Sequence, residues 1–433
     1  MTGASQQWIH MVGIGGAGMS GIARILWEKG YKVSGSDLQK SNVTAQLEKM
    51  GIKIFEGHSA SNVEKGVDLL VISSAIPEDN YEVCEAQIRD IPVIKRGQML
   101  ANLVNSHQGI AIAGAHGKTT TTSMIYYVFD ACGVDPTYII GGELQGTNMG
   151  AKLGKSEYYV IEADESDASF LELKPFVAVV TNIENDHLDY YKNVENIKKA
   201  FSQFIGRVKP EGFALLCGDD RYTREMEYPP QTRIIWYGEN QENDYYIKDW
   251  TSFKTGSKFQ VGSRKGLEET VELVVPGKHN ALNALSAIAV ACELGLDVKK
   301  AIRALKSFRG AKRRFELIGH KKGIMVVDDY AHHPTEIQVT LEAARSFHKG
   351  RLIVVFQPHR FTRTQNLSRE LGESFKNTDL VIFTEVYAAG EKPIEGVNGR
   401  LVYEAAKKIG CESIFIPDFE GIEQYLETKC QRK

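Results

Sequence analysis

Residues 9–37 read IHMVGIGGAGMSGIARILWEKGYKVSGSD. A short apolar run ends in glycines, a segment with helical spacing follows and closes at Gly30, and a second apolar run ends at Asp37. This order predicts a strand, a helix and a second strand, the opening unit of a doubly wound α/β sheet. The same alternation continues through 67–76 and 91–97, so we expect further strands of this sheet there.

The glycines in this stretch have the spacing of a nucleotide-binding turn. Gly13, Gly15 and Gly18 form G-x-G-x-x-G after the predicted strand, Gly16 stands between them, and Asp37 ends the next strand. Glycines let a pyrophosphate approach the backbone, and an acid at the end of the second strand can bind a ribose hydroxyl. Three interpretations stay open at this point: an NAD-type site, a tight turn without a ligand, and a site for another nucleotide diphosphate, since a helix N-terminus attracts any pyrophosphate.

A second glycine-rich stretch, AGAHGKTTTT at 113–122, overlaps the end of the apolar run 109–114. It departs from the common phosphate loop G-x-x-x-x-G-K-[ST], whose first glycine would fall where this chain has Ile112. Lys118 would still reach the β- and γ-phosphates of a nucleotide, and the Thr119 hydroxyl would ligate Mg²⁺. Glycine and threonine also suit an ordinary helix start, but G-K-T-T-T directly after an apolar strand favours a phosphate loop.

Carboxylates and a histidine stand at the ends of the next two predicted strands, 158–164 and 176–186. These residues are Glu162, Asp164, Glu165, Asp167 and His187. Ligands gather at the carboxyl ends of strands in an α/β sheet, so we expect one of the acids to face the loop and help to hold Mg²⁺. The other acids would belong to a solvated loop, and His187 is either a structural residue or a ligand.

Further along the chain the pattern changes twice. Stretches within 233–275 alternate between apolar and polar residues and predict antiparallel strands, and 280–295 has the spacing of a helix. Another α/β layer is predicted by apolar runs that alternate with helical patterns at 323–330, 351–358 and 379–385.

Two loops after strands of this last layer carry histidines and arginines. His332 and His333 are adjacent, but H-E-x-x-H is absent from the sequence and no cysteine lies near them, which argues against zinc. Arg360 and Arg363 suit binding of a carboxylate or phosphate, because a guanidinium group can donate two parallel hydrogen bonds to such groups. The alternative is that both arginines are ordinary surface residues.

The composition is that of a soluble globular protein. The chain has 433 residues, of which 42% are hydrophobic and 25% charged, and this length predicts about three domains with boundaries near 107 and 310. A net charge of −3 without long runs of one sign gives no reason to expect a nucleic-acid or membrane-surface partner. The sequence has no recognisable secretory signal, no apolar run of about 18 residues, and no C-x-x-C among its six cysteines, so we expect a cytoplasmic protein.

Two glycine-rich turns in two domains, only one of which carries a lysine and hydroxyls, indicate an ATP-driven reaction on a second phosphate-bearing substrate. A dehydrogenase would not need the stretch 113–122, and a simple ATPase would not need the first domain.

The ordered motifs GAHGKTTTT, EADESDASF, TNIENDHLD, PGKHNALNALSA, DDYAHHPTE, HRFTRT and VYAAGE resemble those of the Mur ligases over nearly the whole chain. The resemblance implies three domains: a Rossmann-like UDP-sugar-binding domain at 1–106, a central P-loop ATPase domain with a mixed and partly antiparallel sheet at 107–310, and a Rossmann-like C-terminal domain at 311–433. Relatives usually continue past YLETKCQRK with a strand, a Gly-Ala-Gly-Asp turn and a helix, so we expect the third sheet to lack an edge element.

The activity implied by the resemblance is that of an ATP-dependent amide ligase. It would join L-alanine to the lactyl carboxylate of UDP-N-acetylmuramate through an acyl phosphate, in the cytoplasmic synthesis of peptidoglycan precursors. ATP and Mg²⁺, or Mn²⁺ in its place, would be the cofactors, and the enzyme would be a monomer or homodimer. Three alternatives are a ligase that joins a whole tripeptide to the same sugar, a nicotinamide-dependent oxidoreductase and a non-catalytic nucleotide-binding regulator.

Matching motifs carry over the family's site residues. The catalytic set would be Lys118, His116, His187 and Arg363. The nucleotide would contact Gly114, Ala115, His116, Gly117, Lys118, Thr119, Thr120, Asn280, Arg314 and Asp329. The UDP-sugar and alanine would be bound by Gly15, Gly16, Gly18, Asp37, Ser74, Arg96, His333 and Arg360. The metal would be held by Thr119, Glu162 and His187, and His116 would lie near the reacting carboxylate.

Overall fold

The computed structural model of the chain describes residues 7–145, 150–185, 188–253, 256–321 and 323–429. Two compact units make up the fold. The first consists of Met1–Asp249, Phe259–Glu272 and Ala281–Lys312, and the second of Trp250–Lys258, Leu273–Asn280 and Arg313–Lys433. In the part of the chain that is described, no helix is long and apolar enough to cross a membrane.

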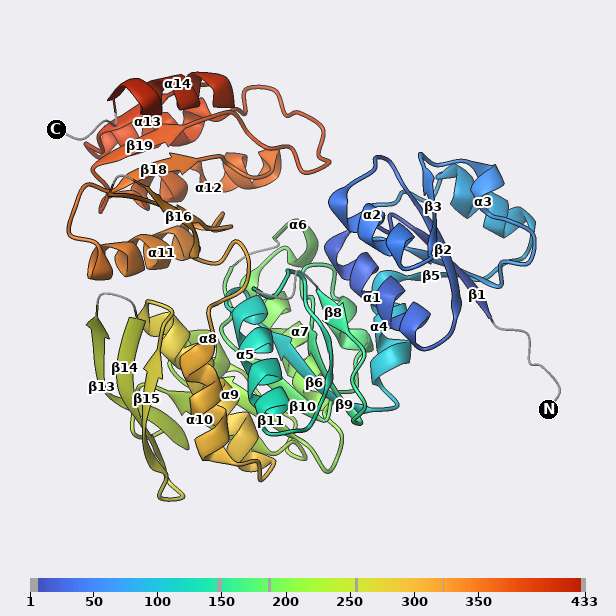
Figure 1. The fold of residues 1–433 in the computed structure, drawn as a ribbon, viewed down its shortest axis with the longest axis horizontal. Coiled ribbons are helices and arrows are strands. Elements are labelled where there is room, and N and C mark those ends of the chain that lie inside the picture. The colour runs from blue at the N-terminus through green and yellow to red at the C-terminus, as the bar shows by residue number, and fades with distance from the viewer. Residues whose placement is uncertain (1–6, 146–149, 186–187, 254–255, 322, 430–433) are drawn as a thin grey trace. The chain divides into compact units, whose positions relative to one another are not determined.

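The first unit opens with a five-stranded parallel sheet (Figure 1). In sheet order its strands are β3 (Lys53–Glu56), β2 (Lys32–Asp37), β1 (Trp8–Val12), β4 (Leu69–Ile72) and β5 (Val93–Lys95). Its helices are α1 (Ala17–Glu28), α2 (Asn42–Lys49), the short 3₁₀ helix η1 (Ala60–Asn62), α3 (Tyr81–Ile88) and α4 (Arg96–Val104). The strand–helix–strand prediction for 9–37 is confirmed, and the strand order reverses between β1 and β4, which is where ligands bind in such sheets.

A local signal fixes the chain just after β2. The Ser41 hydroxyl accepts a hydrogen bond from the Thr44 backbone N–H at 3.2 Å, and the Thr44 hydroxyl accepts one from the Ser41 N–H at 2.8 Å. This reciprocal capping box satisfies two backbone donors and starts α2 at Asn42. Asp37 therefore lies between β2, which it ends, and a helix start that is fixed by its own hydrogen bonds.

A ten-stranded sheet is formed by strands between residues 108 and 273. In sheet order its strands are β15 (Glu268–Leu273), β14 (Gly256–Ser263), β13 (Tyr245–Phe253), β12 (Ile234–Gly238), β11 (Phe213–Cys217), β10 (Val177–Val180), β6 (Gln108–Ala113), β9 (Tyr158–Glu162), β7 (Thr137–Ile139) and β8 (Ala151–Lys152). The helices along this part of the chain are α5 (Lys118–Ala131), η2 (Ser169–Glu172), α6 (Leu188–Tyr191), α7 (Val194–Gly206), α8 (Arg221–Glu225), α9 (Lys278–Glu293) and α10 (Val298–Ser307).

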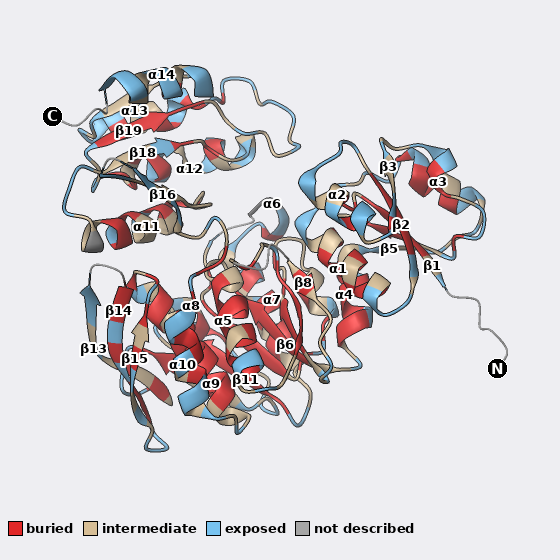
Figure 2. Ribbon diagram, in the orientation of Figure 1, coloured by how far each residue is buried: buried red, intermediate tan, exposed pale blue. Residues whose placement is uncertain are grey.

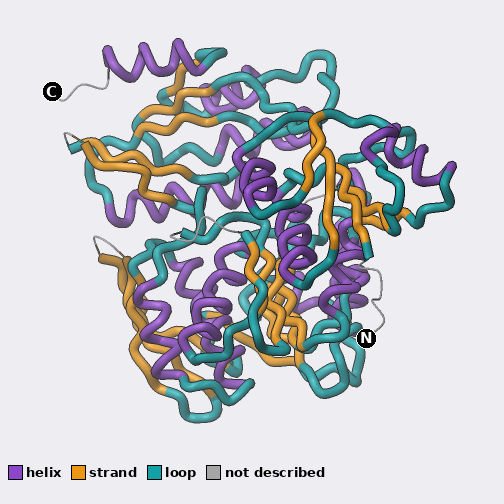
Figure 3. Tube along the Cα trace, turned by 45° about the vertical axis from the view of Figure 1, so that its right-hand side comes forward, coloured by secondary structure: helices purple, strands orange, loops and turns teal. Residues whose placement is uncertain are grey.

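The central strands β6, β10 and β11 are buried along almost their whole length (Figure 2). They read as continuous apolar runs because helices flank the sheet on both sides (Figure 3). Phe170 and Phe204 stack in the core at a ring-centroid distance of 5.0 Å, and both side chains are fully buried.

The prediction of antiparallel strands over 233–275 is wrong for its first part. β12 pairs in parallel with β11, and β13 pairs in parallel with β12 through Tyr237 and Tyr245. The reason lies in burial: β12 reads IIWYG, and none of its residues is exposed, so the strand lies within the covered parallel sheet and presents no face to solvent.

The second unit contains a three-stranded parallel sheet, a two-stranded antiparallel pair and four helices among its described residues. The strands are β16 (Glu316–Lys321) paired with β17 (Ile324–Asp328), and β18 (Ile353–Phe356), β19 (Leu380–Phe383) and β20 (Ser413–Phe415) in that order. The helices are α11 (Pro334–Phe347), α12 (Phe361–Glu373), α13 (Arg400–Lys408) and α14 (Phe419–Lys429).

Strand β19 explains why this sheet is covered on two faces. Val381 and Phe383 pack in one cluster with side chains of α11, α12 and α13, whereas Leu380 and Ile382 pack with Ile422 of α14. Alternate residues of a strand point to opposite faces, so α14 lies on the other face from α11–α13. All three strands predicted here are present, but β17 pairs with β16 and only β18 and β19 belong to the three-stranded sheet; β16 and β20 were not predicted.

Candidate functional site

The first glycine turn, residues 13–18, lies at the carboxyl edge of the five-stranded sheet. The Gly15 N–H donates a 2.8 Å hydrogen bond to Asp37 Oδ2, and the N–H groups of Gly13 and Ile14 donate to the Ser36 carbonyl oxygen at 2.9 and 3.0 Å. The turn is thereby fastened to the end of β2. Strands β4 and β5 end on the same edge and bring Ser74, which is exposed, and Arg96, the first residue of α4, to the same side of the sheet.

Arg96 packs directly on this turn. A Cβ atom on Gly18 would lie 3.1 Å from Arg96 Nη1, so only a glycine leaves the guanidinium group its present place without a shift. The predicted substrate residues Gly15, Gly16, Gly18, Asp37, Ser74 and Arg96 are therefore gathered at one edge of one sheet.

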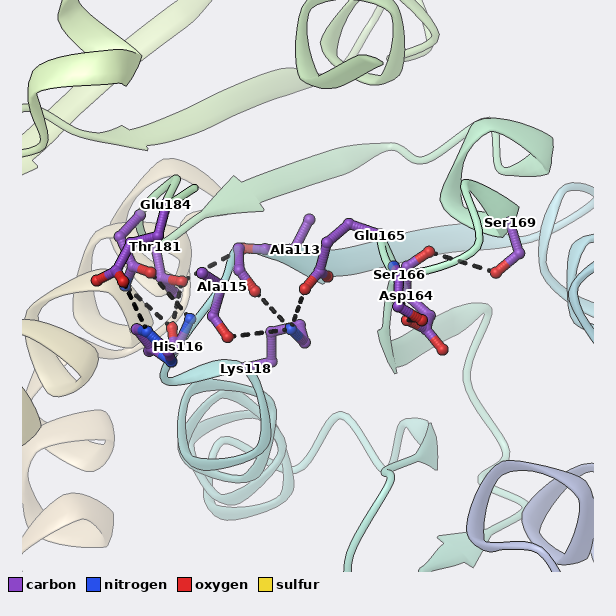
Figure 4. A network of polar contacts seen from close by, with 12 residues as sticks. Ala113, Ala115, His116, Lys118, Asp164, Glu165, Ser166, Ser169, Thr181 and Glu184 are labelled. Carbon is purple, nitrogen blue, oxygen red and sulfur yellow. Dashed lines mark hydrogen bonds and ion pairs between the residues drawn. The ribbon is translucent and has the colours of Figure 1, made fainter. Parts of the chain in front are cut away.

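The second glycine turn, residues 114–118, joins β6 to α5 (Figure 4). Gly114 and Gly117 have φ values of +133° and +84°, a backbone region that residues with a side chain rarely adopt. A Cβ on Gly114 would also collide with the Thr181 hydroxyl. The unusual position of the glycine in AGAHGKTTTT thus follows from the packing of β6 against the end of β10.

Two residues after β10 hold this turn in shape. The His116 carbonyl oxygen accepts hydrogen bonds from the Thr181 hydroxyl at 2.6 Å and the Asn182 side-chain amide at 3.1 Å. The His116 N–H donates to Asn182 Oδ1 at 2.9 Å, and the Ala115 N–H donates to the Asn182 carbonyl at 3.0 Å. The His116 ring meets Glu184, with Nε2 and Oε2 3.2 Å apart.

Lys118 begins α5 and folds back over its own turn. Its ammonium group donates to the Gly114 carbonyl at 2.5 Å and lies 2.7 Å from Glu165 Oε1. Burial alone would lower the pKa of Lys118, but the charge of Glu165 and its hydrogen bond, helped by Asp164 and Glu162, outweigh burial and raise the pKa. The lysine is therefore a permanent cation held inside the turn.

Two of the acids that follow β9, Asp164 and Glu165, pair with different cations. Glu165 pairs with Lys118, and Asp164 Oδ2 lies 2.7 Å from Arg96 Nη2. Burial would raise the pKa of Asp164, but Arg96 and the Ser166 hydrogen bonds keep it below its usual value. Consecutive residues of one strand end therefore hold the cation of each glycine turn, Asp164 for the first and Glu165 for the second.

The side chains of Glu162 and Thr119 each lie beside one of two adjacent glycines, Gly141 and Gly142. A Cβ on Gly141 would lie 2.8 Å from Glu162 Oε2, and a Cβ on Gly142 would lie 3.4 Å from the Thr119 methyl group. A threonine hydroxyl and a carboxylate supply oxygen ligands of the type Mg²⁺ prefers. His187, the remaining predicted metal ligand, lies outside the described residues.

In the second unit, Glu336 of α11 gathers several predicted residues. It lies 3.4 Å from Arg314 Nη1 and accepts hydrogen bonds from the N–H groups of His332 and His333 at 3.0 and 3.4 Å. Asp329 accepts from the Phe315 and Ala331 N–H groups, each at 2.7 Å, and burial raises its pKa.

His359 is the centre of a second group. Its ring accepts or donates hydrogen bonds to the Tyr330 hydroxyl at 3.1 Å and lies 3.3 Å from Arg363 Nη1. Burial lowers the pKa of His359 and of its ring neighbour His332 to about 4, so both rings are neutral near pH 7. Arg363 lies in the first turn of α12, and Arg360 caps that helix with a φ of +71°.

Asn280, the third residue of α9, donates through its side-chain amide to the Pro276 carbonyl at 2.7 Å, and its side chain is buried. Thr120 is buried in the first turn of α5, next to Thr119. These placements leave the predicted nucleotide roles of both residues untested.

Several residues of the site were missed from sequence. Thr181, Asn182 and Glu184 bracket the second turn, and the sequence did not single them out because threonine and asparagine after a strand are common. The sequence also did not predict that Asp164 would pair with Arg96 and Glu165 with Lys118. Strand alternation could have revealed it, since neighbouring side chains at a strand end point in opposite directions.

Sequence models of one family match nearly the whole chain. The matches are "Mur ligase family, catalytic domain" at residues 8–108, "Mur ligase middle domain" at 112–291 and "Mur ligase, glutamate ligase domain" at 313–432.

Individual relatives and solved structures agree. The chain is 58% identical over 428 residues to UDP-N-acetylmuramate–L-alanine ligase of Syntrophomonas wolfei subsp. wolfei, covering 98% of this chain and 92% of the relative. It is 49% identical over 421 residues to the ligase of that name from Desulforamulus reducens, with 96% and 91% coverage. The structure of UDP-N-acetylmuramate-alanine ligase from Thermotoga maritima superposes with a TM-score of 0.83 at 30% identity, covering 96% of this chain and 92% of that one. A murein peptide ligase from Psychrobacter arcticus gives a TM-score of 0.73 at 26% identity, with 98% and 94% coverage.

Proposed function

Because the chain belongs to the Mur ligase family, we propose that it is an ATP-dependent ligase that joins L-alanine to the lactyl carboxylate of UDP-N-acetylmuramate. This reaction is a step in the synthesis of peptidoglycan precursors. We also propose that the chain has three domains, with boundaries at 106/107 and 310/311, which lie close to the limits of the three family matches.

One observation supports this proposal most strongly. Each glycine turn has a cationic side chain beside it, and both cations form ion pairs with acids that follow β9. Arg96 sits on the first turn and pairs with Asp164, while Lys118 sits in the second turn and pairs with Glu165. A reaction between ATP and a second phosphate-bearing substrate needs two such sites within reach of each other. A dehydrogenase would have no use for the second.

The chemistry to be supplied is activation of a carboxylate, which is a poor acyl donor. Transfer of the γ-phosphoryl group to the lactyl carboxylate would give an acyl phosphate, and attack by the alanine amine would release phosphate and leave the amide. Lys118 would stabilise the charge on the transferring phosphoryl group, and the N–H groups of the second turn would hold the β- and γ-phosphates. His116, fixed by Asn182 and Glu184, would stand beside the reacting carboxylate.

Thr119 and Glu162 would hold Mg²⁺, and the position of their side chains beside the adjacent glycines Gly141 and Gly142 supports this assignment. When bound, the metal neutralises phosphate charge and so allows two anionic substrates to meet.

We assign Gly13–Gly18, Asp37, Ser74 and Arg96 to the uridine diphosphate. Residues of the second unit would complete the reaction from their own side: Asn280, Arg314 and Asp329 toward the nucleotide, and His333, Arg360 and Arg363 toward the UDP-sugar and alanine. Arg314 and His333 both contact Glu336, which places one residue of each set side by side, and Arg363 contacts His359.

The test is release of phosphate from ATP, measured with each substrate omitted in turn. We expect release that requires both UDP-N-acetylmuramate and L-alanine, and reduction with borohydride in the absence of alanine should trap the activated sugar carboxylate. Replacement of alanine by the stem tripeptide distinguishes the alternative ligase, which the 58% identity to a UDP-N-acetylmuramate–L-alanine ligase disfavours. Phosphate release with ATP alone, or none with the complete mixture, would reject the proposal.

A further inference from the structure

A carboxylate buried beneath the first glycine turn has no role in the proposed chemistry. Glu82 is the second residue of α3, and its side chain is completely buried. Buried carboxylates are rare unless they are paired or richly hydrogen-bonded. A helix N-terminus stabilises the negative charge in part.

Five residues of the first domain surround this carboxylate. Oε2 faces His10 Nε2 of β1 at 3.0 Å and accepts from the Ser36 hydroxyl of β2 at 2.7 Å. Oε1 faces His58 Nδ1 at 3.2 Å and accepts from the Ser59 N–H at 3.2 Å and the Asn62 amide at 2.8 Å. Burial would raise the pKa of Glu82, but the hydrogen bonds from His10, Ser36 and Asn62 lower it to about 2, so the group is ionised at any physiological pH.

The hydrogen bonds run in one direction toward the carboxylate. Trp8 Nε1 donates to the Ser34 hydroxyl at 2.9 Å, which leaves the Ser34 proton available for His10 Nδ1, 2.8 Å away. His10 then carries its own proton on Nε2 and donates it to Glu82.

Two of these contacts lead straight to the glycine turn. The carbonyl group of Ser36 holds the N–H groups of Gly13 and Ile14, and the hydroxyl of the same serine is anchored on Glu82. Asn62 also donates to the Gly57 carbonyl at 3.0 Å, and the Gly57 N–H donates to the Asp37 carbonyl at 2.7 Å. Both sides of the end of β2 are thus tied to one buried anion.

We infer that Glu82 is a positioning residue for uridine diphosphate: through Ser36 and Asn62 it fixes the end of β2, and with it the first glycine turn and Asp37, in the form that receives the diphosphate. The inference rests on the proposed function for the identity of the ligand. The residue would act on binding of the UDP-sugar and leave phosphoryl transfer at Lys118 untouched.

Glutamine is the sharpest substitution at this position. It has the size of glutamate, but one of its terminal atoms is an NH₂ group that can only donate. Oε1 faces the Ser59 N–H and the Asn62 amide, which can only donate, so the glutamine NH₂ must replace Oε2, where the His10 ring and the Ser36 hydroxyl would have to change their hydrogen-bonding roles. The Glu82→Gln variant therefore disturbs the anchoring of β2 without opening a cavity.

The experiment measures UDP binding to the full chain by calorimetry, together with KM for UDP-N-acetylmuramate and for ATP. For Glu82→Gln we expect the Kd for UDP and the KM for the UDP-sugar to rise by about tenfold or more, as for residues that hold a ligating side chain in place. kcat and the KM for ATP should change less than about twofold, because the second turn is unaltered. Ser36→Ala, which removes only one link, should raise the same two constants by a smaller factor.

A matched control is available in the same unit. Glu293 of α9 is also a buried carboxylate, 3% exposed, which accepts from the Tyr245 hydroxyl and contacts Lys265, both at 2.6 Å. Glu293→Gln should lower the unfolding temperature without changing UDP binding. The inference is overturned if Glu82→Gln and Ser36→Ala fold, as judged by thermal unfolding, and bind UDP within twofold of the wild type, or if Glu293→Gln weakens UDP binding as much.

The two proposals fail in different ways. A wild-type chain that binds UDP but makes no amide would reject the proposed function and leave the Glu82 comparison fully measurable. A wild-type chain that does not bind UDP would overturn both. If Glu82→Gln lowers kcat while UDP binding is unchanged, the residue does not position the first turn and the inference is wrong.

Discussion

The two glycine turns have the same strand–turn–helix order but hold their positive charge differently. In the second turn the cation belongs to the turn itself: Lys118 lies against the Gly114 carbonyl and Glu165. In the first turn the cation is brought from elsewhere, because Arg96 starts a helix two strands away and packs on Gly18. A lysine inside the turn suits a group whose charge moves during reaction, whereas a backbone turn with a neighbouring arginine suits a diphosphate that is only held.

The largest effect should come from Lys118→Ala. We expect turnover to fall by at least about 10²-fold, as when one preorganised charge-stabilising donor is removed, while calorimetric binding of UDP stays unchanged. Lys152→Ala is the matched control, since Lys152 pairs with Asp135 at 3.0 Å away from both turns. Near-wild-type turnover in Lys118→Ala would show that the two turns do not differ in the way described.

Arg96→Ala should act on both turns at once. Loss of a charged hydrogen bond of this kind changes an equilibrium by about tenfold, so we expect UDP affinity and kcat each to fall by about that factor. Arg96→Lys keeps the charge but not the two-pronged geometry and should restore only part of the loss. Steady-state kinetics should measure KM and kcat separately. An effect confined to kcat would mean that Arg96 influences only the second turn.

A smaller effect is expected from Asp37→Asn, which keeps an acceptor for the Gly15 N–H but removes its charge. UDP binding should weaken by about fivefold, the size of one modest hydrogen-bond difference. In the same titrations the wild type should bind UDP and not NAD. Micromolar binding of NAD without binding of UDP would mean that the first turn belongs to a different class of enzyme.

The smallest expected effect is on pH dependence, which should differ between the two glycine turns and the second unit. The pKa of Lys118 is raised and that of Glu82 is about 2, so UDP affinity should not change through titration of either group between pH 5 and 9. His332 and His359 have pKa values of about 4 in the folded chain and about 6.5 when unfolded, so the unfolded state binds more protons between these values. Stability contributed by these histidines is therefore present above pH 6.5 and lost as pH falls toward 4. Thermal unfolding should show this loss, and His359→Asn should reduce its slope.

The sequence predicted the framework well because periodicity reports burial directly. The strand–helix–strand order of 9–37 is confirmed, and so are the strands of the second unit at 324–328, 353–356 and 380–383. β12 was assigned the wrong pairing because a short buried strand looks alike in parallel and antiparallel sheets.

Site residues were harder to assign because pairing is a tertiary property. Asp164, Glu165 and Asp167 could not be told apart from composition, and only the positions of Arg96 and Lys118 give the first two separate partners. Glu82 left no signal at all, since a glutamate in the first turn of a helix usually lies on the surface. The sequence contains all the residues of such networks but does not show which of them are in contact.

Asp164 and Glu165 are joined by a single peptide bond, and this has a thermodynamic consequence. A ligand that weakens the pairing of Arg96 with Asp164 acts on the residue next to the counter-ion of Lys118. If occupancy of the first turn changes the affinity of the second for ATP by some factor, ATP must change the affinity of the first turn by the same factor, because such coupling is reciprocal. Each substrate can in this way change the affinity for the other without a separate regulatory site. ATP can then bind weakly until the UDP-sugar is bound.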